Sequence, residues 1–128
     1  MKTFAKSQVW LAGLALVIGM FVAQASLAHH GWAWATDVEF ELTGTITKAR
    51  LGNPHGELNV AVKDEDWVVE VGQPWRNERA GLSDEMLGVG RVITVHGHRS
   101  ANPEQRVMKA ERIIIDGKSY DLYPDRKS

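Results

Sequence analysis

Apolar and polar side chains alternate at every second position through much of the chain after residue 37. The first stretch is typical, because Val38, Phe40 and Leu42 are apolar and the residues between them are glutamates. Such alternation predicts strands that bury one face and expose the other. By this criterion we expect strands over residues 38–47, 58–62, 67–71, 91–99, 107–115 and 118–123.

The alternation stops between the third and fourth of these strands. Pro74 near the start of the gap and Gly81 at its end are the signals of a short helix, and Ser83 is a candidate cap for a further helical turn. Three strands, a helix and further strands form the order of an OB-type barrel. We therefore expect a mainly β fold, a small OB-like barrel of five to six strands with one short helix between strands three and four. A small sandwich is the alternative, because strand order alone does not close a barrel.

The first 28 residues follow a different pattern. Lys2 and Lys6 precede an apolar run over residues 9–23, and small residues follow it at Ser26 and Ala28. This is the layout of a secretory signal peptide, which we expect to be cleaved after Ala28. A permanent anchor is the alternative, although the run is shorter than the about 20 apolar residues that cross a bilayer. We expect a periplasmic protein with no stable membrane anchor after cleavage.

This interpretation divides the chain into four parts. They are the signal peptide (1–28), an amino-terminal segment with candidate metal ligands (29–37), the OB-like barrel domain (38–123) and a tail (124–128).

Charge and cysteine content narrow the function classes. Removing Lys2 and Lys6 with the signal peptide leaves 13 basic against 16 acidic side chains, a net charge of −3. This balance argues against a nucleic-acid partner, for which a clustered basic face is expected. The chain has no cysteine, which excludes disulfides, thiolate metal sites and cysteine nucleophiles. Nucleophile elbows, phosphate loops and metalloprotease helix motifs are also missing from the sequence, so an enzyme is the least favoured class.

Several short motifs resemble one known family. They are Ala28-His29-His30-Gly31, Leu42-Thr43-Gly44-Thr45-Ile46, Gly52-Asn53-Pro54-His55, Gly72-Gln73-Pro74, residues 90–97 and Asp116-Gly117-Lys118. Together they resemble the exported bacterial proteins labelled domain of unknown function 6152 (DUF6152), over essentially the whole chain after residue 28. Arg91 departs from the acidic residue that members usually carry. The resemblance implies an OB-type fold in the periplasm and no established activity.

The histidines carry the main functional hypothesis. Cleavage after Ala28 would leave His29 with a free α-amino group, and this amine and the His29 imidazole can chelate one metal ion. His30 can add a second imidazole or a deprotonated amide. Nitrogen ligands of this kind suit Cu(II) among first-row ions. The alternative is that His29 and His30 form a solvated stub.

Three further histidines are candidate ligands. His55 lies in the turn Asn53-Pro54-His55-Gly56, which Pro54 and Gly56 make rigid. It either joins His29 in a three-nitrogen copper site or caps its own turn. His96 and His98 form a second tier, because residues two apart on a strand share a face. Their alternative is a partly exposed strand end.

The leading hypothesis is thus a periplasmic single-domain binding or accessory protein that binds copper or another transition metal. The alternative is a non-metal module for a small molecule or an envelope protein partner, with Trp34, Trp67 and Arg99 as the candidate surface. Trp34 and its neighbour Trp32 would lie on one extended face, where they dock the amino-terminal segment or simply pack.

Overall fold

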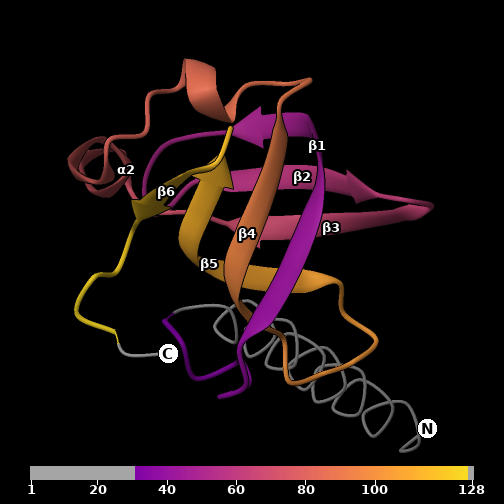
Figure 1. The fold of residues 1–128 in the computed structure, drawn as a ribbon. Coiled ribbons are helices and arrows are strands. Elements are labelled where there is room, and N and C mark those ends of the chain that lie inside the picture. Colours follow the sequence, from indigo (N-terminus) through magenta and orange to yellow (C-terminus); the bar gives the residue numbers. More distant parts are fainter. Residues whose placement is uncertain (1–30, 127–128) are drawn as a thin grey trace, which may run out of the picture. The chain divides into compact units, whose positions relative to one another are not determined.

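Residues 31–126 are described by a computed structural model, in which residues from Ala35 onward form one compact unit. Strands are the main regular structure of this unit, as the alternation predicts (Figure 1). Its elements are β1 (Phe40–Arg50), β2 (Glu57–Val62), β3 (Glu65–Glu70), α2 (Pro74–Ala80), the single 3-10 turn η1 (Glu85–Leu87), β4 (Val92–Arg99), β5 (Val107–Ile115) and β6 (Lys118–Asp121). Within residues 31–126, no helix is both long and apolar enough to span a bilayer.

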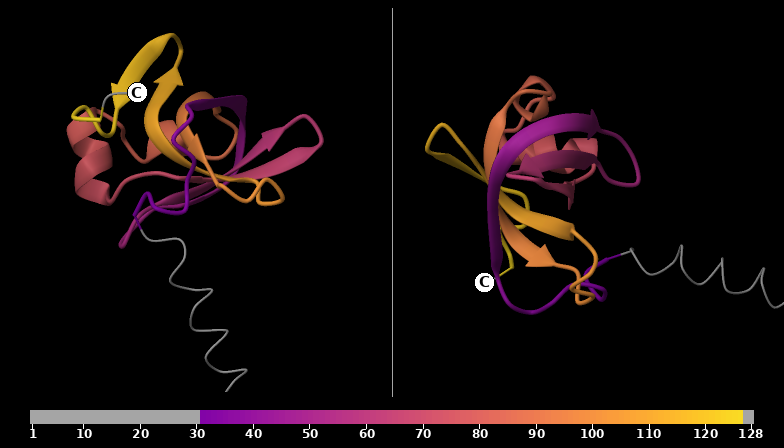
Figure 2. Two further views of the ribbon diagram at one scale, coloured as in Figure 1. Left: turned by 90° about the horizontal axis from the view of Figure 1, so that it is seen from below. Right: turned by 90° about the vertical axis from the view of Figure 1, so that its right-hand side faces the viewer.

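Strand pairing closes the sheet into a barrel. The hydrogen-bonded order is β3-β2-β1-β4-β5-β6, and a parallel pairing of β3 with β5 joins the two sides. Five strands therefore form a closed ring, and β6 extends the sheet from β5 (Figure 2). β1 serves both halves, because Phe40–Thr45 pairs with β4 and Thr45–Arg50 pairs with β2. The expected OB-like barrel is confirmed, and the sandwich alternative is wrong.

The barrel interior holds the core. Apolar residues with at most a few per cent exposure come from every barrel strand and from the segments that flank the helix. They include Leu42, Ile46, Leu58, Val60, Trp67, Val69, Leu82, Leu87, Ile93, Val95, Met108 and Ile113. They alternate with polar residues along most of the strands, which is why the period-two pattern located them.

Strand ends are where the structure departs from the pattern. β3 begins at Glu65 rather than at Trp67, because Glu65 pairs with Val62 and accepts a hydrogen bond from the Trp67 Nε1 at 3.0 Å. β1 begins at Phe40 and continues to Arg50, beyond a register shift between Ile46 and Lys48. After this bulge the strand is exposed, so no buried face reveals it in the sequence.

The helical connection is confirmed between the third and fourth strands. α2 ends at Gly81, whose φ of 95° is a left-handed conformation that glycine adopts without strain. The buried Asn77 side chain accepts a hydrogen bond from the Gly72 amide at 3.0 Å and donates one to its carbonyl at 3.1 Å. These two bonds fasten the helix to the end of β3. Ser83 Oγ accepts a 3.4 Å bond from the Met86 amide, next to η1.

The close approach of β4 to β5 gives a stability prediction. A Cβ at Gly97 would lie 1.9 Å from the Lys109 carbonyl oxygen, which is backbone of the partner strand. Gly97→Ala should therefore lower the free energy of unfolding by about 3 kcal/mol or more, measured by urea denaturation. Gly117→Ala is the control, because its Cβ meets nothing within 4 Å and only its φ of 78° is unfavourable. That variant should lose about 1 to 2 kcal/mol. Equal losses in the two variants would show that the strand contact is not limiting.

Candidate functional site

The loop between β1 and β2 is held against the end of β3 by Gly56. The Gly56 amide donates to the Gly72 carbonyl at 3.0 Å, and the Val71 amide donates to the Gly56 carbonyl at 2.9 Å. A Cβ at Gly56 would lie 2.7 Å from Val71 Cγ2, so a larger residue would push the loop outward. The absence of a side chain at Gly56 therefore brings its neighbour His55 up to β3.

His55 meets two glutamates at this point. Its Nε2 lies 3.6 Å from Glu70 Oε1, and Glu57 is the third member of the group. One ligand atom from each of the three residues lies within 4.8 Å of the others. Glu57 and Glu70 stand directly opposite each other on β2 and β3, and Glu70 is only 3% exposed. No other group of three such side chains occurs within residues 31–126.

The ring of His55 is oriented by a backbone contact. Its Nδ1 lies 3.3 Å from the Gly56 carbonyl oxygen. A carbonyl can only accept, so this contact places a proton on Nδ1 and leaves Nε2 facing Glu70. Metal-binding histidines are commonly held in this way. The same contact is also expected if His55 only caps its own turn. It is therefore consistent with His55 as a metal ligand and with His55 as a turn cap.

Two basic side chains flank the glutamates. Arg50 is paired with Glu57 across β1 and β2 and forms an ion pair with it. Lys109 stands beside Glu70 in the parallel pairing of β3 with β5. Arg50, Glu57, Glu70 and Lys109 thus follow one another across four neighbouring strands, and we call them the charged row.

Partial burial affects two titratable groups near Glu70. Desolvation lowers the pKa of Lys109, and the nearby Glu70 charge opposes this shift without cancelling it. Burial also raises the pKa of the Tyr123 hydroxyl, against the opposing effect of the Arg76 guanidinium. Water is therefore partly excluded on the Lys109 side of the charged row.

A cavity opens on the other side of the row. It has a volume of about 230 Å³ and is lined by Arg50, His55 and Glu57 together with the loop residues Leu51, Gly52, Asn53 and Pro54. The Asn53–Pro54 peptide in this loop is cis. His55 and Glu57, two of the three members of the cluster, are therefore accessible from a small hollow beside a guanidinium group.

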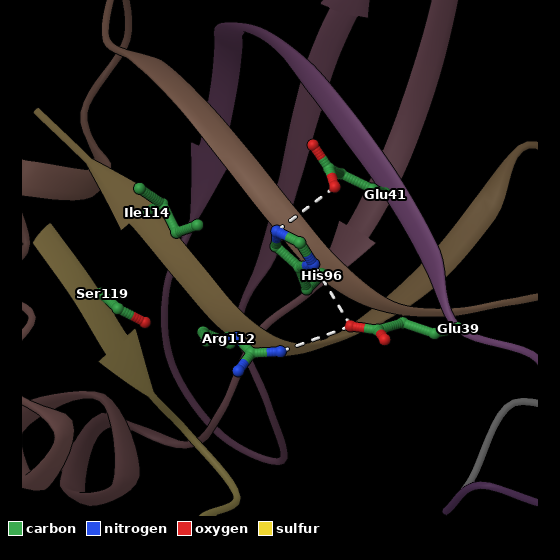
Figure 3. Close-up of a pocket in the computed structure, with 6 residues that line it drawn as sticks. All are labelled: Glu39, Glu41, His96, Arg112, Ile114 and Ser119. Carbon is green, nitrogen blue, oxygen red and sulfur yellow. Dashed lines mark hydrogen bonds and ion pairs between the residues drawn. The ribbon is translucent and has the colours of Figure 1, made fainter. Parts of the chain in front are cut away.

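His96 belongs to a different and larger hollow on the outer face of β1, β4, β5 and β6 (Figure 3). Its Nδ1 lies 3.2 Å from Glu39 Oε1, and its Nε2 lies 3.4 Å from Glu41 Oε2. Arg112 also reaches Glu39, at 3.3 Å. Because the two carboxylates contact opposite nitrogens of the ring, these three side chains do not converge on one point.

His98 is buried in a separate network. Its Nδ1 lies 2.8 Å from the Thr36 carbonyl oxygen and its Nε2 lies 2.7 Å from Glu111 Oε1. Arg126 donates to the same carboxylate oxygen at 2.8 Å. Both ring nitrogens are therefore engaged, and the structure does not bring His96 and His98 together as ligands. His29 and His30 lie outside the described residues.

The residues proposed for a partner surface are placed differently. Trp67 is buried and stacks on Phe40, with ring centroids 5.0 Å apart. The Arg99 guanidinium lies 4.9 Å from the Trp67 ring centroid and donates to the Pro103 carbonyl at 3.1 Å. Trp67 and Arg99 therefore pack on each other. Trp34 belongs to the preceding unit of the chain.

Sequence reasoning identified His55 and missed Glu57, Glu70 and Arg50. A signal for the glutamates exists, because the two-residue turn at Lys63 and Asp64 sets the register of the β2–β3 hairpin. That register places Glu57 opposite Glu70. The contact of both with His55 depends on the approach of the loop to β3, for which the only local sign is Gly56.

Comparison with known proteins agrees with the motifs noted in the sequence. The model of a family of unknown function, DUF6152, matches residues 17–108, which is most of the chain. The match includes the loop of His55 and both glutamates of the cluster. No curated protein matches the chain closely enough to count as a relative. The chain belongs to the DUF6152 family.

Proposed function

We propose that the protein is a periplasmic binding module that holds a first-row transition-metal ion, copper first, between His55, Glu57 and Glu70. The observation that carries the proposal is the convergence of one ligand atom from each residue within 4.8 Å. One imidazole nitrogen and two carboxylate oxygens are acceptable ligands for Cu(II), Ni(II) and Zn(II), and affinity generally peaks at Cu(II) in this series.

Two features of the cluster support a bound cation. The Nε2 of His55 faces the buried Glu70, while its Nδ1 contacts the Gly56 carbonyl. Glu70 is a carboxylate with almost no exposure, and a buried negative charge is favourable only with a compensating positive charge nearby. Lys109 is such a charge, and carboxylates that ligate metals are commonly held by a second partner in this way.

His29 and His30 form a second, independent part of the proposal. If the signal peptide is cleaved after Ala28, the His29 amine and imidazole form a terminal copper chelate, with His30 beside it. Its support is the sequence alone. The alternative function, a non-metal module for a small molecule or an envelope protein, predicts that replacing His29 and His30 leaves function unchanged and that function depends on Trp34, Trp67 and Arg99.

Copper titration tests the barrel site. The chain is exported with its own leader, and in a second form, called the blocked form, His29 and His30 are both replaced by alanine, which removes the terminal chelate. In the blocked form, His55→Ala and Glu57→Gln should each weaken Cu(II) binding at least about tenfold, or about 1.4 kcal/mol, because each removes one ligand. Isothermal calorimetry measures the affinity, and thermal unfolding checks that the variants are folded.

His96→Ala is the matched control for this titration. His96 also lies between two carboxylates, but these contact opposite ring nitrogens. The blocked form of this variant should bind copper as the blocked form with His96 intact does. Binding that survives His55→Ala, or that is lost in His96→Ala, would contradict the barrel site.

The amino terminus itself is a separate prediction. Intact mass of the protein recovered from the periplasm should correspond to a chain that starts at His29, with residues 1–28 removed. Copper measured on the same sample should fall in the blocked form, because that form lacks the His29 and His30 imidazoles. A chain that retains residues 1–28 would contradict the predicted cleavage, and a cut at a neighbouring position would contradict the chelate formed by the His29 amine and imidazole.

A further inference from the structure

We propose that a metal ion held by His55, Glu57 and Glu70 binds together with a small organic carboxylate, which bridges the ion and the Arg50 guanidinium. This inference rests on the proposed metal site. It goes beyond the metal ion by assigning a second ligand, a small organic carboxylate, to the cavity beside the cluster. The argument uses the charges of the row, the position of Arg50 and the lining of the cavity.

The four side chains of the row carry no net charge before a metal binds, and Arg76 and Arg126 add positive charge near Lys109. Arg50, Glu57, Glu70 and Lys109 comprise two basic and two acidic side chains, in consecutive register on four strands. A divalent ion would add two positive charges to this balanced set, at a place where Glu70 is buried and Lys109 is partly desolvated. Excess charge in such surroundings is unfavourable, and an anion beside the ion would reduce it.

Arg50 is placed to bind that anion. Among the described residues, its ion-pair partner is Glu57, which is also a proposed ligand of the metal. When the Glu57 carboxylate shares its charge with a metal ion, its attraction for the guanidinium falls. A guanidinium has five N–H donors, so Arg50 can contact a second carboxylate while it remains near Glu57.

The cavity determines the class of anion. Three protein ligands leave at least one coordination position for an external ligand. Arg50, His55 and Glu57 line the same hollow of about 230 Å³, so an anion in it can reach both the ion and the guanidinium. Leu51 and Pro54 form part of the wall and provide apolar contact. A small carboxylate with an apolar end fits this lining better than a fully hydrated inorganic anion.

Copper binding with and without acetate tests the inference. The blocked form of the whole exported protein is titrated with Cu(II) in perchlorate salt and in acetate salt of equal ionic strength. Acetate should strengthen Cu(II) binding at least about tenfold, although acetate in solution competes weakly for free copper. Because coupling is reciprocal, copper should raise the affinity for acetate by the same factor.

Arg50→Gln and Arg106→Gln complete the experiment. In Arg50→Gln the acetate effect should fall below about twofold, while copper binding in perchlorate should be equal or tighter, since a cation that competes for Glu57 is gone. Arg106 is the matched control, an exposed arginine 3.7 Å from Glu65 and outside the cavity lining. Arg106→Gln should keep the full acetate effect.

The outcomes separate the two proposals. Copper binding that is lost in His55→Ala but is insensitive to acetate would overturn this inference and leave the metal site in place. An acetate effect that persists in Arg50→Gln would also overturn it. If His55→Ala binds copper normally in both salts, the metal site and the inference fail together.

Discussion

The parallel pairing of β3 with β5 is the constraint on which the rest of the structure depends. Val68, Val69 and Glu70 lie beside Val107, Met108 and Lys109, and the Val68 amide donates to the Arg106 carbonyl at 2.9 Å. Without this contact the strands would form an open sheet with two exposed edges. With it, Val69 and Met108 are fully buried, and Glu70 is drawn from a strand end into a site with almost no exposure. Closing the barrel thus also creates the buried carboxylate of the candidate site.

A buried carboxylate next to a loop histidine arises here from two separate local features. The register of the β2–β3 hairpin aligns Glu57 with Glu70, and the missing side chain at Gly56 lets the loop approach β3. Neither feature would assemble the cluster alone. With the hairpin register but no close approach, His55 would stay in solvent, and with the approach but a register shifted by one residue, Glu57 would turn to the barrel interior.

The sequence predicts the strands well where one face is buried, because burial imposes the alternation that reveals them. The sequence predicts strand ends poorly where neither face of the strand is buried. Lys48–Arg50 continue β1 beyond its bulge with both faces exposed, and Glu65 extends β3 through contacts with Val62 and Trp67. For the site, the rigid turn pointed to His55, but its partners follow from pairing across strands. His96 and His98 occupy equivalent positions in the sequence pattern, but their surroundings in the structure differ. His96 lines an open hollow, whereas His98 is buried and bonded to Glu111.

The three described histidines show why contact with a carboxylate does not by itself make a metal site. His96 lies between Glu39 and Glu41, but each of its nitrogens is directed to a different partner. His98 has both nitrogens occupied, one by the Thr36 carbonyl and one by Glu111. His55 has its Nδ1 on a carbonyl and its Nε2 toward Glu70, and it is the histidine of these three that shares a group of three candidate ligands, with Glu57 and Glu70 paired on adjacent strands. Coordination needs lone pairs that converge on one point, and among the histidines in the described part of the chain only His55 meets that requirement.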